Sequence, residues 1–479
     1  MEKLIFRFDE KKLAGSYSPE IKKVLMYKKW TKLIPDDISR IGQPLADSIR
    51  RMALPIPARV LDFLTISLSV TAADTFVLRK NADDGWCRVI HLDLPVSDVK
   101  FWLSQKELLE KTLNFLSGDI WKFTFIEESY DFKINTSPRK NLKKIPIKAH
   151  DCVCLFSGGL DSAIGAIDLL AEGKDPLLVS HGYKGDKSHQ MRIKSSLDNF
   201  FGGSIGHLIL NAHPVTAKSG CRDREITMRT RSLSFLAFGL LGVSAVQAFS
   251  TPFGSKDSLA IEKDPSQASK RMKLYVPENG FISINPPLTR RRIGSHSTRT
   301  THPQFLIGIQ ELFDKAGFSC EIENPCAFKT KGEMMQLCRR PKLLETILKE
   351  TVSCSHWKRS RQQCGICLPC LIRRCSINSY GHTTFDATYT YPDISHAFMK
   401  FEVNEGKKDD IASVLEFLQL KGQKAQLLKR IRMSGRLPEK DIPKYFDLVC
   451  RQIAELEKFF RDHTDLARYL PPEEDKIDS

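Results

Sequence analysis

The sequence lacks the pattern of a secretory leader, so we expect none, and it has no long uninterrupted hydrophobic run. Its 479 residues begin without the basic and then apolar pattern of a signal peptide, and Asp9 and Glu10 follow at once. The longest apolar stretch, 233–249, is interrupted by serine, glycine and glutamine and falls short of a comfortable membrane span. We therefore predict a cytoplasmic protein without a membrane partner, in which 233–249 forms a buried core helix.

Acidic residues are few relative to basic ones. The chain has 57 Asp and Glu against 73 Lys and Arg, a formal net charge of +16. This excess favours anionic partners such as nucleotides, nucleic acid or acidic protein surfaces, although an ordinary solvated basic surface produces the same balance. Charge therefore narrows the class of partner without choosing one.

The cysteines lack the even number that a disulfide framework would favour. There are thirteen of them, and they are clustered, which fits reduced thiols and a metal better. The densest group has two C-x-x-C steps, a spacing that predicts a closed tetrahedral Zn²⁺ site with four thiolate ligands: Cys354, Cys364, Cys367 and Cys370. An iron–sulfur cluster is the chemical alternative, and Cys375 could replace one ligand.

A glycine turn joins a short apolar run to a helical pattern at residues 152–170. Residues 152–156 are few enough for a central parallel strand, and apolar residues then recur at helical spacing. Gly158 and Gly159 let the backbone approach a ligand, and the helix that begins near Asp161 offers unpaired N–H groups to an anion. The lysine of the ATPase loop G-x-x-x-x-G-K-[ST] is absent. The pattern predicts a phosphate site that is not a simple phosphate-hydrolysing motor.

The hexapeptide 157–162, Ser-Gly-Gly-Leu-Asp-Ser, resembles the PP-loop of the ATP pyrophosphatases, which split ATP between its α and β phosphates to adenylate a substrate. The resemblance implies ATP and Mg²⁺ as cofactors, with Asp161 helping to hold the metal. It also implies a set of nucleotide contacts along the loop: Ser157, Gly158, Gly159, Leu160 and Ser162. A glycine-rich turn with no ligand is the alternative reading.

Further polar residues follow predicted strands or precede helices. Residues 176–182 are expected to form a second parallel strand whose carboxyl end faces the same crevice, so Ser180 and Gly182 are candidate contacts for adenine or ribose. Arg231 precedes the long apolar helix, where a cation gains little from the helix dipole, and so indicates a bound anion. The polar stretch 294–303 predicts either a loop that closes over a carboxylate, phosphate or purine edge, or a merely solvated loop.

The region 150–380 resembles the 7-cyano-7-deazaguanine synthase (QueC) family. The matching pattern is Thr-x-Ser-Cys at 351–354 and Cys-Gly-x-Cys-x-x-Cys-x-x-Arg at 364–373, with Lys-Gly-Glu at 331–333 and the PP-loop upstream. The resemblance implies adenylation of 7-carboxy-7-deazaguanine, displacement of AMP by ammonia, and a structural zinc. It implies catalytic roles for Asp161, Ser162, Arg231 and Arg299. Expected substrate contacts are Glu278, Asn279, Arg299, Thr300, His302 and Lys331.

Two departures qualify this resemblance. The substrate segment of the biosynthetic enzymes is replaced by 297–303, and the regions before 150 and after 380 have no counterpart in them. The chain is more similar to the enlarged QueC-like proteins of bacterial antiviral operons, the QatC type. That similarity implies a 7-deazapurine small-molecule substrate joined to an amine on a partner protein. Nitrile synthesis for queuosine-type nucleosides, or modification of a tRNA base, remains the alternative.

The expected fold class is α/β, with a doubly wound parallel sheet of the adenine nucleotide alpha hydrolase type and a zinc-binding knob. Residues 1–148 are predicted to form an α+β accessory domain, with strands at 63–70, 89–94 and 121–126 and a helix at 103–116. A basic, proline-marked linker at 137–148 leads to the catalytic domain at 149–385. Residues 386–479 are expected to form a helical extension that ends in a disordered acidic tail, 471–479.

Overall fold

The computed structural model describes residues 1–14, 18, 20–29, 31, 34–130, 132, 144–183, 185–219, 223–250, 271–293, 299–357, 361–381, 383–402, 410–462 and 464–472. Three expectations fall at least partly outside these ranges: most of the linker at 137–148, the first half of the polar stretch 294–303, and nearly all of the acidic tail.

Two five-stranded sheets form the framework, and every described strand pair in them is parallel. The first has the order β3-β2-β1-β4-β5, with β1 Glu2–Arg7, β2 Lys22–Met26, β3 Ile38–Ile41, β4 Val89–Val96 and β5 Ile120–Glu127. The second has the order β10-β9-β6-β7-β8, with β6 Cys152–Leu155, β7 Pro176–His181, β8 His207–Leu210, β9 Met272–Tyr275 and β10 Cys320–Glu323. The predicted α/β class is confirmed.

The first unit is α/β rather than the predicted α+β. The expected strand at 63–70 lies inside helix α2, Ala58–Phe76, whereas β4, β5 and helix α4, Lys106–Ser117, lie where they were expected. Helix α2 is buried on nearly every side, so its sequence carries no helical periodicity. Its hydroxyl groups donate back to carbonyls one turn earlier, as from Ser69 Oγ to Thr65 O at 2.8 Å, which satisfies them without a strand partner.

The second sheet is covered by helices on both faces. Cys152 and Cys154 of β6 belong to a core with helices α5, Leu160–Ala171, and α6, Asp186–Phe201. Val153 and Leu155, which alternate with them, belong to the core of helix α7, Arg231–Ser250. The arrangement is consistent with a doubly wound sheet.

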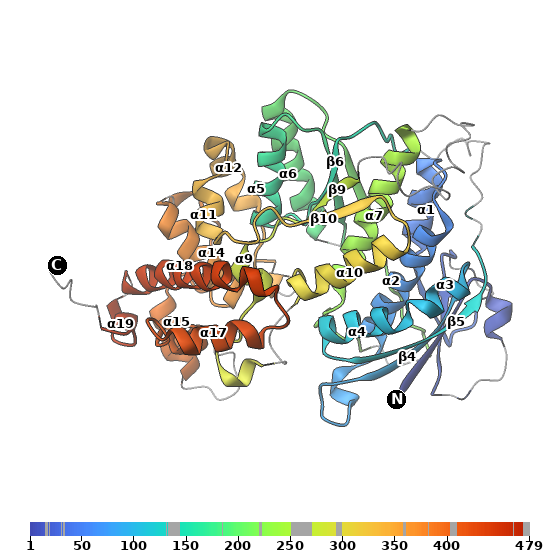
Figure 1. The fold of residues 1–479 in the computed structure, drawn as a ribbon, viewed down its shortest axis with the longest axis horizontal. Coiled ribbons are helices and arrows are strands. Elements are labelled where there is room, and N and C mark those ends of the chain that lie inside the picture. The colour runs from blue at the N-terminus through green and yellow to red at the C-terminus, as the bar shows by residue number, and fades with distance from the viewer. Residues whose placement is uncertain are drawn as a thin grey trace.

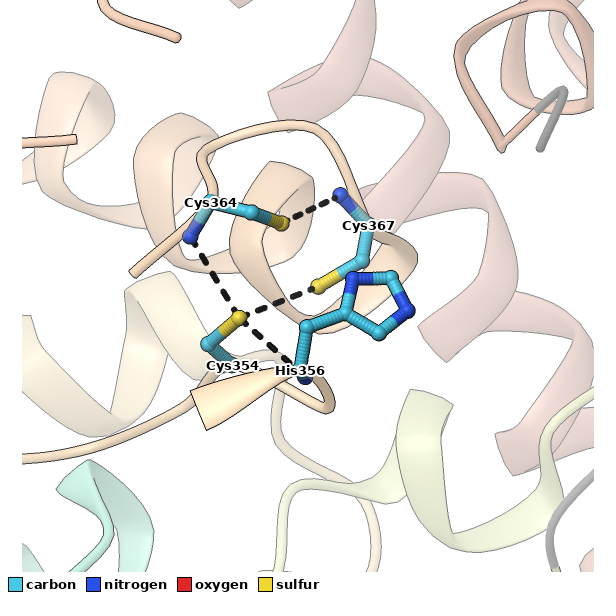
Figure 2. A group of neighbouring side chains, drawn as sticks. All are labelled: Cys354, His356, Cys364 and Cys367. Atoms are coloured by element: carbon cyan, nitrogen blue, oxygen red, sulfur yellow. Dashed lines mark hydrogen bonds between the residues drawn. The ribbon is translucent and has the colours of Figure 1, made fainter. Parts of the chain in front are cut away.

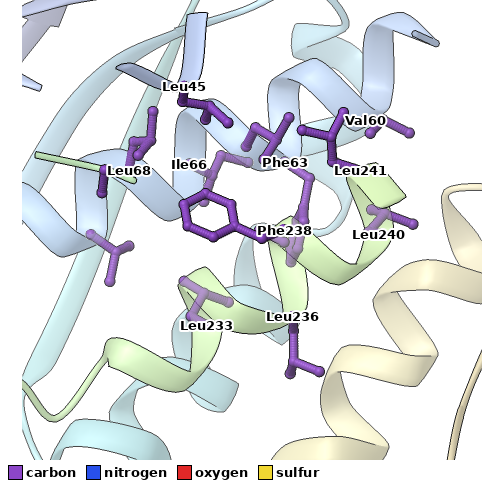
Figure 3. Packing of buried hydrophobic residues seen from close by; sticks show 14 of the residues in the cluster. Leu45, Val60, Phe63, Ile66, Leu68, Leu233, Leu236, Phe238, Leu240 and Leu241 are labelled. Carbon is purple, nitrogen blue, oxygen red and sulfur yellow. The ribbon is translucent and has the colours of Figure 1, made fainter. Parts of the chain in front are cut away.

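Helices α2 and α7 pack directly against each other between the two sheets (Figures 1 and 3). One continuous hydrophobic cluster runs from Phe6 of β1 through Phe63 and Phe238 to Val153 of β6. Helix α7 is long and apolar enough to cross a membrane by length and composition, yet 78% of its most hydropathic window is buried in this core. The prediction of a buried core helix is confirmed.

The C-terminal helices lie at the opposite end of the molecule from the first sheet (Figure 1). They form a separate hydrophobic cluster around α18 and α14, as expected for a helical extension. Their bounds are α14 Leu368–Tyr380, α15 Ile394–Glu402, α16 Asp410–Leu418, α17 Lys424–Met433, α18 Ile442–Arg461 and α19 Thr464–Ala467. The remaining α-helices are α1 Gln43–Met52, α3 Val99–Ser104, α9 Gly280–Ile284, α10 Pro303–Lys315, α11 Lys331–Gln336 and α12 Pro341–Ile347.

The shared core predicts that the two sheets unfold together. Phe238 is fully buried against α2, so Phe238→Ala should lower the free energy of unfolding by about 3–5 kcal/mol. Urea unfolding followed by circular dichroism should show one transition that moves as a whole. Two transitions, of which only one moves, would indicate independently stable sheets.

Candidate functional site

The predicted phosphate loop is a tight turn between β6 and α5. Gly158 has φ +82°, a conformation that strains any residue with a Cβ atom. The hydroxyls of Ser157 and Ser162 lie 3.1 Å apart, and Gly159 N–H donates to Ser157 Oγ at 3.2 Å. Helix α5 begins at Leu160 without a side-chain cap, so its first N–H groups remain available to a ligand. The side chain of Leu160 is buried, so only its backbone can take part.

A cavity of about 440 Å³ opens beside this turn, a size typical of small-molecule sites. The loop residues Ser157, Gly158, Gly159 and Ser162 form part of its wall. Four other lining residues carry a buried polar atom that has no hydrogen-bond partner among the described residues: Arg231 Nε, Ser232 Oγ, Thr301 Oγ1 and Trp357 Nε1. A buried polar group left unpaired costs about 1–3 kcal/mol, so these atoms suit a polar ligand that would pair with them.

A pair of carboxyl groups, the buried Asp161 and the half-buried Glu278, lies next to the loop. Asp161 accepts hydrogen bonds from Lys331 Nζ, from Asn279 N at 3.0 Å and from Asn279 Nδ2 at 2.7 Å. Burial opposes its ionisation, but the Lys331 charge and the hydrogen bonds hold the pKa of Asp161 near 2. Glu278 lines the cavity, and burial together with the Asp161 charge raises its pKa well above the usual range. The pair therefore combines one carboxyl group whose pKa is lowered with one whose pKa is raised.

Arg231 is fixed at the cavity wall from two sides. Its Nη2 donates to Asp186 Oδ2 at 2.9 Å, and its guanidinium lies 5.2 Å from the Tyr183 ring centroid. The chain just before it is held by the first unit, because Asp74 Oδ2 accepts from both Thr230 N and Thr230 Oγ1 at 2.9 Å. Arg231 therefore lines the same cavity as the loop. Asp74 of the first unit holds the residue before it in place.

Thr300 lines the cavity, but its neighbours Arg299 and His302 do not. Arg299 Nη1 donates to Phe115 O at 2.6 Å, and the guanidinium lies over the Phe115 ring. His302 caps α10 by accepting from Gln304 N at 3.1 Å, and burial with the Arg299 charge lowers its pKa to about 3. Both residues anchor the segment to other parts of the fold instead of facing the cavity.

Ser180 and Gly182 also lie outside the cavity lining. Ser180 Oγ donates to Phe156 O at 2.5 Å and lies 2.8 Å from His207 Nε2. A Cβ atom on Gly182 would lie 2.6 Å from Ile209 Cγ2. The end of β7 is therefore used for packing within the sheet, and the expected adenine or ribose contacts are not among the cavity residues. Asn279 and Lys331 do not line the cavity either, and both contact the carboxylate of Asp161.

The four predicted zinc ligands come together. Cys354 Sγ lies 3.9 Å from Cys367 Sγ, and Cys364 Sγ lies 3.9 Å from Cys370 Sγ. Tetrahedral zinc with bonds of about 2.3 Å requires sulfur atoms about 3.8 Å apart. Backbone N–H groups of Cys364 and Cys367 donate to neighbouring thiols at 3.3 Å, which stabilises thiolates (Figure 2). These residues fit Zn²⁺.

His356, which the sequence did not single out, is a further candidate ligand. Its imidazole and the sulfur atoms of Cys354, Cys364 and Cys367 offer ligand atoms that all lie within 4.8 Å of one another (Figure 2). His356 follows Cys354 by two residues, a spacing too short for the usual zinc patterns. Cys375, named as a possible replacement, instead donates to Ile372 O and is fully buried in the C-terminal core.

The metal cluster is joined to the phosphate loop. Val352 N–H donates to Gly158 O at 3.0 Å, and Val352, Cys354 and Trp357 all line the cavity. The segment that leads into the metal ligands therefore forms the part of the cavity wall that adjoins the turn. Thr301 belongs to the polar stretch 294–303 that the sequence singled out, although it was not named as a contact. Trp357 was missed because nothing in its local sequence marks it, and only the packing of distant segments places it here.

Comparisons with protein-family models, with curated proteins and with solved structures find no match to this chain. The chemistry of the site is therefore argued from its geometry and from the sequence motifs.

The carboxyl pair predicts a pH-dependent stability. Because the pKa of Glu278 is raised in the fold, its contribution is complete below the ordinary value of 4.5 and is lost as the pH rises through the raised value. Glu278→Gln keeps a hydrogen-bond donor and has no proton to lose. Urea unfolding from pH 5 to 9 should show the variant gaining stability relative to the native chain as the pH rises.

A matched control is Glu311→Gln on α10, whose carboxylate is half-exposed and pairs with Lys315. Its stability difference from the native chain should stay constant over the same pH range. If Glu278→Gln also gives a constant difference, then Glu278 is not protonated in the fold at neutral pH.

The metal cluster predicts one zinc per chain. Cys367→Ser should lower zinc content and soluble yield, because a structural zinc supplies on the order of 10 kcal/mol of folding energy in small zinc domains. Cys87→Ser, which removes a thiol of the first unit, should keep both. Elemental analysis checks the metal, and stoichiometric iron with sulfide would contradict the zinc assignment.

Proposed function

We propose that this protein binds ATP in the 440 Å³ cavity and cleaves it between the α and β phosphates to adenylate a carboxylate. One observation carries the proposal. A glycine turn and an uncapped helix start meet a cavity whose other walls hold four buried polar atoms without partners. Unpaired N–H groups at a helix start suit an anion such as pyrophosphate, and the other unpaired atoms suit the rest of the ligand.

The reaction follows from the weakness of a carboxylate as an electrophile. A substrate carboxylate oxygen attacks the α-phosphorus, the bond to the β-phosphate oxygen breaks, and pyrophosphate leaves. An amine then attacks the acyl carbon, AMP leaves with the electron pair of the broken C–O bond, and the amine loses one proton. Such a reaction needs positioning and charge neutralisation more than a strong base.

The roles fall to residues that line the cavity and to Leu160 and Asp161, which lie beside it. The backbone of 157–160 and the hydroxyl of Ser162 hold the pyrophosphate, and Arg231 faces the phosphate or carboxylate charge. Glu278 and Asp161 would hold Mg²⁺, which would neutralise phosphate charge when bound. Glu278 would give up its proton to do so, because two adjacent carboxylates ionise together only beside a cation.

The substrate class is proposed from the sequence resemblance. A 7-deazapurine carboxylate such as 7-carboxy-7-deazaguanine would supply the acid, and ammonia or an amine on a partner protein would supply the nucleophile. The indole of Trp357, with its unpaired Nε1, offers a planar wall for a purine-like ring. A role in bacterial antiviral defence, in the cytoplasm where ATP is present, follows from the same resemblance.

The purified chain with ATP, Mg²⁺ and 7-carboxy-7-deazaguanine should therefore release pyrophosphate and AMP. A coupled pyrophosphate assay measures the rate, and chromatography identifies the nucleotide. Release of ADP and phosphate instead would contradict adenylation. Arg231→Ala should reduce kcat/KM by about tenfold to a hundredfold, since a charge-assisted hydrogen bond is worth about 1.5–3 kcal/mol.

Arg432→Ala is the matched control for that variant. Arg432 lies on α17, is more than half exposed and pairs only with Glu439. It removes the same charge far from the cavity and should leave kcat/KM unchanged. Equal losses in the two variants would mean that overall charge, and not the cavity, governs turnover.

A further inference from the structure

A second cavity, of about 240 Å³, lies at the seam between the two sheets. It is lined by Lys28, Lys29, Arg40, Ile41, Gln43, His213 and Val215. Three of these side chains are permanently cationic, one is an imidazole, and none of the described lining residues is acidic. No part of this cavity coincides with the lining of the 440 Å³ cavity.

The positive charge of this second cavity is only partly compensated. Lys28 Nζ has a single acidic neighbour, Glu10 Oε2, at 3.6 Å. Neither Lys29 nor Arg40 has a side-chain ion pair or hydrogen bond in the described part of the chain. Burial lowers the pKa of Arg40, which reflects the cost of keeping its charge without a counter-ion. Bringing like charges together is unfavourable unless an anion joins them.

The backbone around the cavity is rigid and joins both sheets. Arg40 and Val215 exchange two hydrogen bonds of 2.8 Å, and Gly42 N–H donates to Ala212 O at 2.8 Å. Helix α1 begins at Gln43 after Gly42 without a side-chain cap, so the positive end of its dipole lies beside the same residues. Arg40 lies in β3, Lys28 and Lys29 follow β2, and His213 follows β8, so a ligand here would bridge the two units.

We propose that this second cavity binds a phosphate group of a small phosphorylated molecule. The charge favours an anion, and an arginine with two lysines and a helix start is the chemistry that recognises phosphate. The volume is below the usual 300–1,000 Å³ of small-molecule sites, so it holds a phosphate with little of what is attached. A nucleic-acid backbone would instead need an extended basic stripe. The inference does not depend on the proposed adenylation.

The test is phosphate binding by the full-length chain. Titration calorimetry with inorganic phosphate, at constant ionic strength set with chloride, is compared for the native chain, Arg40→Gln, Lys29→Gln and Lys429→Gln. Lys429 lies exposed on α17 and serves as the charge-matched control. Ser162→Ala reports on phosphate bound at the glycine turn. Repeating the titration with AMP and with a single-stranded DNA distinguishes the sources of phosphate.

Arg40→Gln and Lys29→Gln should each weaken phosphate binding by about tenfold or more, while Ser162→Ala and Lys429→Gln leave that binding component unchanged. If AMP also binds and its binding is weakened by Arg40→Gln, the ligand is a nucleotide phosphate. If inorganic phosphate binds and AMP does not, the ligand is the free anion. Either result supports the site. Binding lost in Ser162→Ala but kept in Arg40→Gln would overturn it. So would affinity for DNA alone, or a response to chloride equal to that for phosphate.

Discussion

The buried charge of Asp161 is the constraint on which the rest of the site depends. Burying a carboxylate away from water costs several kcal/mol of free energy unless it is paired with a cation and hydrogen-bonded. In this protein three segments meet to pair and hydrogen-bond the buried Asp161. They are the start of α5, the turn at 278–279 and the start of α11 with Lys331. Removing Asp161 would leave the Lys331 ammonium buried without a partner. The carboxylate therefore holds three segments together, and its charge adds to burial in raising the pKa of Glu278.

The metal cluster is a second place where distant segments meet beside the glycine turn. Its ligands lie on a loop and at the start of α14, and the chain just before them is hydrogen-bonded to the phosphate turn through Val352 and Gly158. Metal binding would hold this loop in one conformation, since a closed four-ligand site fixes the backbone on both sides. The cavity wall that carries Trp357 is thereby linked to the metal, although the metal would take no part in the reaction.

The first unit shares a core with the second sheet and helps to position Arg231. Helix α2 and helix α7 form one core, and Asp74 at the end of α2 holds Thr230, the residue before Arg231. An arginine at the start of a helix gains nothing from the dipole, so its position must be fixed by such contacts. The seam between the two units also produces the second cavity, where Lys28, Lys29 and Arg40 of the first unit meet His213, which follows β8.

What the sequence determined by itself is local. The spacing of the cysteines sets which thiols can share a metal, the two glycines and the adjacent serines set the turn, and the apolar stretch at 233–249 required a buried helix. Each of these features involves residues no more than 16 positions apart (354 to 370, and 233 to 249), so it can be recognised from a short stretch of the chain.

Tertiary structure decided what lies far apart in the chain. Residues 63–70 alternate like a strand but form a helix, because burial on all sides removed the periodic signal and nearby carbonyls satisfied the hydroxyls. Arg299 and Arg231 look equally suited to an anion, yet only Arg231 lines the cavity, since Arg299 is held by Phe115, 184 positions away. Asp161 and Lys331 meet across 170 positions. Contacts of that separation depend on how the sheets and helices pack, which no local pattern encodes.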